Sequence, residues 1–163
     1  MEKESRNVFF EEIPGSGRVE ITSFVFDYNG TLATDGIPLP GVEEQLIKLA
    51  EKGDIYILTA DTFGTAATYV EEWPAELVIL PQDDQKEAKA EFVKKLGSGR
   101  CAALGNGAND GAMIAAARLG ICLIQDEGCS ASTLGKADLV FTRISDAIDV
   151  FLKPGRLRAT LRV

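Results

Sequence analysis

The chain alternates between short apolar runs and longer segments whose apolar residues recur at helical spacing. Residues 23–27 are a nearly unbroken apolar run that ends in Asp27, which is typical of a strand covered on both faces of a sheet. Five further runs have the length of a strand: 54–59, 76–80, 100–104, 121–124 and 138–141. Helices are expected over 41–52, 62–73, 83–96, 109–119, 130–136 and 144–152. This alternation predicts βαβ units, and therefore a three-layer, doubly wound α/β fold with a mostly parallel sheet.

The two ends of the chain do not show this alternation of strands and helices. Residues 8–13 and 18–22 are β-prone runs around a Pro/Gly turn, which predicts an N-terminal hairpin. We expect residues 1–6 to be disordered, residues 33–40 to form a loop, and the basic tail 153–163 to be a solvated end. A chain of 163 residues without a linker or internal repeat is most simply a single domain, 1–163.

Composition and charge exclude several classes of function. The formal net charge of −8 argues against a nucleic-acid partner, because that affinity is carried by Lys and Arg. Neither a signal peptide nor a membrane span is recognisable, so we expect no membrane partner and a cytoplasmic location. The absence of histidine removes His-based triads and His-ligated zinc. Cys101, Cys122 and Cys129 lack metal-site spacing, and the first two are interpreted as small core residues.

The first segment with chemical potential follows the apolar run at 23–27. Asp27 is followed by Asn29 and Gly30, and an Asn-Gly pair is the strongest two-residue hairpin signal. However, the residues after Thr31 make a poor return strand for so apolar a partner. The segment is therefore either a turn or the edge of an active site, because ligands of parallel sheets bind beyond the carboxyl ends of the strands.

The segment GNGAND, residues 105–110, follows a strand and opens a helix, so dinucleotide binding has to be considered. The acidic residues Asp126 and Glu127 lie about 20 residues downstream, as such a site requires. The fingerprint, however, needs a glycine where this chain has Asp110, and a carboxylate there would repel a pyrophosphate. A cation ligand at Asp110, with Asn109 as the helix cap, fits better than a nucleotide site, although a plain Gly-rich turn remains an alternative.

Two further positions belong to the same edge of the predicted sheet. Thr59 ends the second central strand, where a hydroxyl is either a local cap or a donor to a phosphoryl oxygen. Lys86 and Lys89 lie on a charged helix whose default interpretation is a solvated face. Lys89 is followed by Phe92 and Val93, so it is closer to the buried side of that helix.

Together these segments resemble the four motifs of the haloacid-dehalogenase-like (HAD) hydrolase superfamily, in order and in approximate spacing. The resemblance covers residues 19–152, and it is strongest to soluble P-type-ATPase-like proteins without a cap domain. The segments that carry it are DYNGTL, LTADTFGT, the lysine at position 89 with its Val and Leu partners, and GNGAND.

The resemblance implies a role for each matching residue. Asp27 would be the nucleophile that forms an aspartyl-phosphate, with Asn29, Thr59 and Lys89 as the other catalytic positions. The phosphoryl group would be bound by Gly30, Thr59, Ala60 and Lys89. The cofactor would be Mg²⁺, held by Asp27, the backbone carbonyl of Asn29, Asn106 and Asp110.

Two asparagines depart from the phosphatase pattern. Asn29 replaces the aspartate that acts as general acid and base, a contribution typically worth ~10²–10⁴-fold. Asn106 replaces an aspartate near the metal, which predicts weaker Mg²⁺ binding. We therefore expect a Mg²⁺-dependent phosphohydrolase that is slow on ordinary phosphomonoesters, or else a phosphate-binding or regulatory module with little turnover. Without a cap domain, the partner is expected to be a phosphorylated small molecule or macromolecule, and the chain a homo-oligomer.

Overall fold

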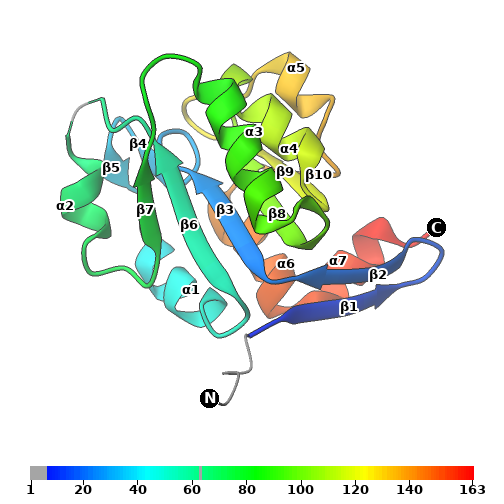
Figure 1. Cartoon of the computed structure of the whole chain (residues 1–163). Helices are drawn as coiled ribbons and strands as arrows, with labels where there is room; N and C mark the ends of the chain where they lie inside the picture. The colour runs from blue at the N-terminus through cyan, green and yellow to red at the C-terminus, as the bar shows by residue number, and fades with distance from the viewer. Residues whose placement is uncertain (1–6, 63) are drawn as a thin grey trace, which may run out of the picture.

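The computed structural model describes residues 7–62 and 64–163, and its centre is a six-stranded sheet (Figure 1). All the pairings within this sheet are parallel, and the strand order is β10-β9-β8-β3-β6-β7. The strands are β3 (Ser23–Asp27), β6 (Asp54–Thr59), β7 (Glu76–Ile79), β8 (Cys101–Gly105), β9 (Leu119–Leu123) and β10 (Leu139–Phe141). The predicted α/β fold is confirmed, and each of the six predicted strands is present within two residues of its expected bounds.

The strand β3 lies in the middle of the sheet, between β6 and β8, and all five of its residues are buried. Its side chains alternate between two cores. Phe24 points to the face covered by α1 (Val42–Leu49) and α6 (Ile144–Leu152), where it packs against Phe151 at 4.9 Å between ring centroids. Val25 belongs to the opposite core, under α3 (Gln85–Leu96) and α4 (Gly111–Ala116) (Figure 1). The three-layer arrangement thus follows from a strand that is buried at every position and apolar from Phe24 to Phe26.

The N-terminal hairpin and the C-terminal tail pack together. The predicted hairpin is confirmed as β1 (Phe9–Ile13) and β2 (Gly17–Ile21), and it lies beside α7 (Pro154–Leu161) in Figure 1. The basic side chains Lys153, Arg156 and Arg158 are more than half exposed, as expected for a solvated end, but the tail also packs against the fold. Leu157 of α7 is fully buried, and Arg158 donates to Glu11 of β1 at 2.7 Å. The tail therefore forms the helix α7, which buries an apolar residue against the fold although its composition indicates a polar terminus.

Four elements differ from their predicted form. The predicted loop 33–40 contains a small antiparallel pair, β4 (Ala33–Thr34) and β5 (Ile37–Pro38). The helix predicted over 62–73 is only α2 (Ala66–Val70), since the Asp61 carboxylate accepts from the N–H groups that begin it. The helix predicted over 109–119 is divided into the 3₁₀ helix η2 (Ala108–Asp110) and α4. The helix predicted over 130–136 is the shorter α5 (Ala131–Leu134).

Three other expectations concern the termini, position 63 and the cysteines. Residues 1–6, expected to be disordered, and position 63 of the predicted helix lie outside the described residues. Cys101 is buried, as predicted, and it is a free cysteine; burial raises the pKa of its thiol to about 11. Cys122 is buried in the core, as predicted, and it also forms a disulfide with Cys129, which was not predicted.

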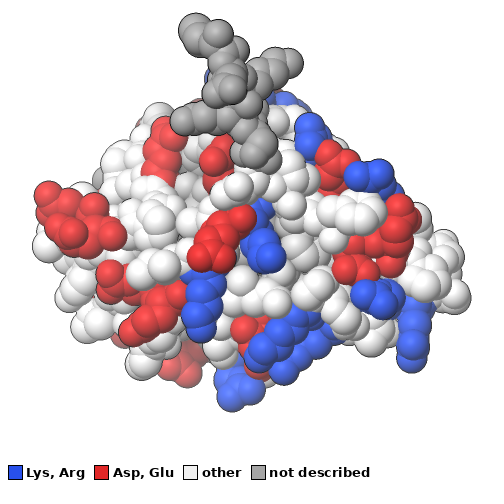
Figure 2. Space-filling model, turned by 90° about the horizontal axis from the view of Figure 1, so that it is seen from below, with Lys and Arg blue, Asp and Glu red and all other residues white. Residues whose placement is uncertain are grey.

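Charges of both signs cover the face of the molecule at the amino ends of the strands. Figure 2 shows that Lys and Arg side chains are interspersed there with Asp and Glu. Among the cations of the tail, Lys153 and Arg156 both pair with Asp149. Among residues 7–62 and 64–163, none of the helices combines the length and the apolar composition that crossing a membrane requires.

Candidate active site

The carboxyl ends of the central strands meet at one edge of the sheet and bring the predicted site residues together. Asp27 ends β3 and Thr59 ends β6, and the two strands are in register, with Asp27 opposite Leu58. On the other side of β3, the strand β8 runs into residues 105–110. The segment after Asp27 does not turn back as a hairpin, because both neighbours of β3 are parallel to it. The hairpin interpretation of the Asn-Gly pair is therefore excluded.

The most buried ionic contact in the described chain lies directly at this edge. The Lys89 ammonium donates to Oδ1 of Asp27 and to Oδ1 of Asp110, at 2.7 Å in both cases. Lys89 is only 1% exposed, and the Asp110 side chain is fully buried. The neighbouring candidate, Lys86, is exposed on the same helix. The structure thus brings Lys89, and not Lys86, into the site.

Asp110 is held in place by its second carboxylate oxygen. Its Oδ2 accepts from the backbone N–H of Asn106 at 3.0 Å and from that of Gly107 at 2.9 Å. Asp110 is also the N-cap residue of α4, so the prediction that Asn109 caps this helix is wrong. Asn109 lies inside η2, and its side-chain amide donates to Gln85 Oε1. The tight turn before the helix requires a glycine at 105, since a Cβ there would collide with the Asp110 carboxylate.

The protonation of the cluster reflects two carboxylates that share one cation. Burial, followed by the charge of Asp110, raises the pKa of Asp27 to about 7, although Lys89 acts in the opposite direction. Burial alone would lower the pKa of Lys89, but the charges of Asp27 and Asp110 outweigh it and raise that pKa above its ordinary value. Lys89 is therefore a permanent positive charge beside the candidate nucleophile.

A cleft of about 310 Å³ opens above this cluster. It is lined by predicted site residues, namely Asp27, Asn29, Thr59, Ala60 and Asn106. It is also lined by residues that were not predicted to form the site, namely Thr62, Gln85, Gly107, Asn109 and Glu127. The hydroxyl oxygen of Thr59 accepts from the N–H of Asp61 at 3.0 Å, which leaves its own hydrogen free to point at a ligand.

The predicted phosphoryl-binding residue Gly30 does not present its backbone N–H to the cleft. That N–H donates to the carbonyl of Ala33 at 2.7 Å, and the Gly30 carbonyl accepts from Gln125. Gly30 has a φ of 83°, and a Cβ there would collide with the Asn106 amide. Its contribution is therefore to let the turn and Asn106 approach each other closely.

The two asparagines that break the phosphatase pattern are used in the loops around the cleft. Oδ1 of Asn29 accepts from the N–H of Gly36, at 2.8 Å, in the turn between β4 and β5. Nδ2 of Asn106 donates to the carbonyl of Gly128 at 3.0 Å. Both side chains thus tie neighbouring loops to the ends of the central strands.

The donors at this edge fit Mg²⁺. Asp27 and Asp110 converge on a single positive charge, Lys89, and the carbonyl of Asn29 follows Asp27 closely in the chain. Mg²⁺ sites commonly use one or two carboxylates and keep several waters. Within the described ranges there is no cluster of three or more His, Cys, Asp or Glu side chains that could hold a metal ion.

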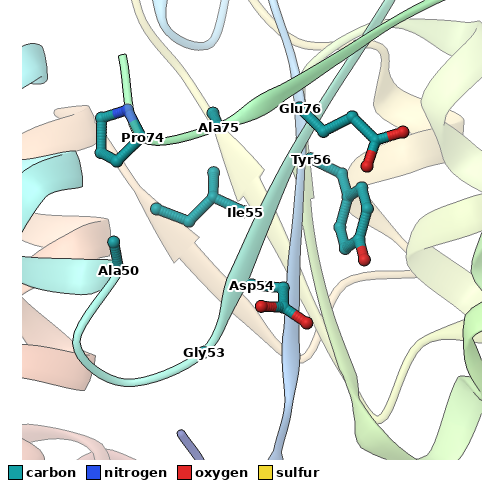
Figure 3. Close-up of a pocket in the computed structure, with 8 residues that line it drawn as sticks. All are labelled: Ala50, Gly53, Asp54, Ile55, Tyr56, Pro74, Ala75 and Glu76. Carbon is teal, nitrogen blue, oxygen red and sulfur yellow. The ribbon is translucent and has the colours of Figure 1, made fainter. Parts of the chain in front are cut away.

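A second hollow, of about 420 Å³, lies at the opposite end of the sheet (Figure 3). It is formed at the amino ends of β6 and β7, and its charged residues are Asp54 and Glu76. Both are acids and none of the residues that line this hollow is a cation, whereas Lys89 contacts Asp27 in the cleft at the other end of the sheet. The cleft above Asp27 is consequently the better candidate for phosphate chemistry.

Comparisons with known proteins give a close relative of unknown function. No family model matches the chain. The chain is 42% identical over 94 residues to the uncharacterized protein MJ0073 of Methanocaldococcus jannaschii, a match that covers 58% of this chain and 91% of that protein. A second uncharacterized protein of that organism, MJ0072, is 55% identical over 38 residues, which is 23% of this chain and 86% of that protein.

Several solved structures share the fold. One is 3-deoxy-D-manno-octulosonate 8-phosphate phosphatase from Moraxella catarrhalis, in complex with magnesium, phosphate and KDO, with a TM-score of 0.63 and 22% identity over 85% of this chain and 90% of that one. Another is a Legionella pneumophila protein assigned to the HAD subfamily III A hydrolases, with a TM-score of 0.64 and 17% identity over 86% of each chain. A phosphoserine phosphatase in the apo form has a TM-score of 0.64 and 15% identity over 82% of this chain and 98% of that one.

Proposed function

Because the chain belongs to the same family as MJ0073 and has the fold of the HAD hydrolase superfamily, we propose that it is a Mg²⁺-dependent phosphohydrolase acting through Asp27. One observation carries this proposal. Asp27 ends the central strand inside a polar cleft, and Lys89 contacts it and Asp110 equally, at 2.7 Å. A nucleophilic carboxylate, a fixed cation and a second carboxylate are the groups that phosphoryl transfer through an aspartate requires.

In the first half of the reaction, an Asp27 oxygen attacks the phosphorus while the bond from phosphorus to the leaving oxygen breaks. Lys89 and the free hydroxyl hydrogen of Thr59 stabilise the charge on the transferring group. Mg²⁺, bound by Asp27, Asp110 and the Asn29 carbonyl, would supply further neutralisation of phosphoryl charge. In the second half, water attacks the phosphorus and releases Asp27 and inorganic phosphate.

The nature of the leaving group follows from Asn29. Its amide cannot donate a proton to a departing alkoxide, and its Oδ1 is already occupied by the N–H of Gly36. General acid help is typically worth ~10²–10⁴-fold. Acyl phosphates need little protonation of the leaving oxygen, so we propose that they turn over faster than alkyl phosphomonoesters. The substrate class is a phosphorylated small molecule that fits the cleft above Asp27.

The proposal is tested with acetyl phosphate and p-nitrophenyl phosphate, each with and without Mg²⁺. We expect Mg²⁺-dependent phosphate release, faster with acetyl phosphate, and a phosphorylated Asp27 detectable by mass spectrometry at acid pH. The Asp27→Asn variant should lose both. Asp54→Asn, which changes the acid hollow at the opposite end of the sheet, should retain both. If the wild type shows neither turnover nor labelling, the chain is a phosphate-binding or regulatory module, for which the occupied Asn29 amide is the supporting observation.

A further inference from the structure

Hydrolysis of a phosphorylated Asp27 needs a group that takes a proton from the attacking water. Asn29 cannot do so, and Lys89 is held in its charged form by two carboxylates. Of the ten residues that line the cleft, Asp27 and Glu127 are the two that carry a carboxyl group. Since Asp27 is consumed as the nucleophile, Glu127 is the remaining carboxylate of the cleft.

The position of Glu127 is related directly to that of Asn29. The turn between β4 and β5 offers two consecutive backbone N–H groups, those of Asp35 and Gly36. Oε2 of Glu127 accepts from the N–H of Asp35 at 3.3 Å, and Oδ1 of Asn29 accepts from the N–H of Gly36 at 2.8 Å. The Glu127 carboxylate and the Asn29 amide are thus bound to neighbouring residues of one turn, and both residues line the cleft.

The loop that carries Glu127 is fixed to the site from both sides. Nε2 of Gln125 donates to the carbonyls of Gly30, at 3.2 Å, and Thr31, at 3.0 Å. After Glu127, the Gly128 carbonyl accepts from the Asn106 amide at 3.0 Å. These contacts order the loop relative to the strand that ends in Asp27, which is what a positioned catalytic group requires.

We propose that Glu127 is the general base for hydrolysis of phosphorylated Asp27, in place of the carboxyl that Asn29 lacks. The inference rests on the proposed function. As the oxygen of water bonds to phosphorus, one water proton passes to the Glu127 carboxylate. The bond between phosphorus and the Asp27 oxygen breaks, and its electron pair returns to the Asp27 carboxylate. Glu127 then releases the proton to solvent, so that phosphate and the original enzyme are regenerated.

The decisive variant is Glu127→Gln, because glutamine still offers Oε1 to the N–H of Asp35 but cannot accept a proton from water. Rapid mixing with acetyl phosphate and Mg²⁺ separates formation of the phosphoenzyme from its decay. We expect the decay rate to fall by roughly 10²-fold or more, with the formation rate within about twofold of the wild type. The phosphoenzyme should therefore accumulate at steady state.

Two further variants make the interpretation specific. Asp126→Asn removes an exposed carboxylate from the same loop that does not line the cleft, and it should decay at the wild-type rate. Introducing Asn29→Asp into the Glu127→Gln enzyme should restore rapid decay, since it supplies another carboxyl group in the same cleft.

The outcomes separate this inference from the proposed function. Wild-type decay in Glu127→Gln overturns the role of Glu127, while a phosphorylated Asp27 in the same experiment leaves the phosphohydrolase intact. An equal fall in formation and decay also overturns it, because a disturbed loop would slow both steps. Failure of the wild type to form any phosphoenzyme removes the proposed function and this inference together.

Discussion

Replacing Lys89 with methionine tests how the site is held together. The substitution keeps the length of the side chain but removes the charge that lies 2.7 Å from both Asp27 and Asp110. Lys89 is 1% exposed, so water cannot replace the lost cation without opening the core. Removing one partner of a buried ion pair typically costs ~3–5 kcal/mol, because an uncompensated charge remains. Here two carboxylates are left facing each other, so we expect a value at the upper end.

The measurement is urea unfolding in Mg²⁺-free buffer at pH 8, followed by the fluorescence of Trp73, which is buried. A loss of about 5 kcal/mol, with an m-value of about 2 kcal/mol/M, moves the midpoint down by about 2.5 M. Lys86→Met is the matched control from the exposed side of the same helix, and its effect should stay within about 0.5 kcal/mol. Equal midpoints for the two variants would refute the view that Lys89 neutralises the buried carboxylates.

Two further variants probe the same edge of the sheet. The pKa of Asp27 is raised from 3.8 to about 7 in the folded protein. The protonated Asp27 carboxyl therefore contributes to folding stability fully below pH 3.8, and this contribution is lost as the pH rises through about 7. In Mg²⁺-free buffer, the melting temperature of Asp27→Asn relative to wild type should therefore increase between pH 5 and pH 8; calorimetry showing a constant difference would contradict this. Gly30→Ala should cost about 1–3 kcal/mol in urea unfolding, because of its positive φ and the Asn106 amide. Gly155→Ala, in an open helical position, should be neutral or slightly stabilising.

Much of the site could be predicted because its residues stand where strongly patterned elements end. An apolar run such as β3 is recognisable as a central strand, and the residue that ends it, Asp27, must then lie at the carboxyl edge of the sheet. Lys89 was identified by its spacing from Val93, which is fully buried on the same side of α3. In both cases a short-range pattern determines the position of the functional group.

Glu127 could not be assigned in this way, because its position depends on tertiary contacts. The sequence shows only an acidic pair in a loop, and its relation to the site is set by Asp35, far earlier in the chain. The turn at Asp35 carries a signal, an Asp-Gly pair with φ of 51° and 82°, which is typical of a tight hairpin. Two-residue strands such as β4 are, however, too short to have a recognisable period.

The disulfide and the shortened helix α2 were missed for similar reasons. Spacing does not reveal which cysteines pair, and Cys122 and Cys129 meet only because β9 and the following loop fold back. The start of α2 is decided by one carboxylate, Asp61, which binds the N–H of Ala66 at 2.9 Å. The sequence pattern predicts a helix that begins at residue 62, whereas α2 begins at Ala66.

The pairing of the N-terminal hairpin with the tail has a consequence for the order of folding. The Ser16 hydroxyl donates to the carbonyl of Leu161, 145 positions later, and the N–H of Val163 donates to the carbonyl of Pro14. The hairpin is synthesised before its packing partner, α7, which follows the whole parallel sheet in the chain. Contacts that close so long a loop form late and slow the search for the native state. Until then, the apolar underside of the hairpin, including Ile13, is exposed to other chains, so assembly on the ribosome is the stage at which this fold is most prone to aggregate.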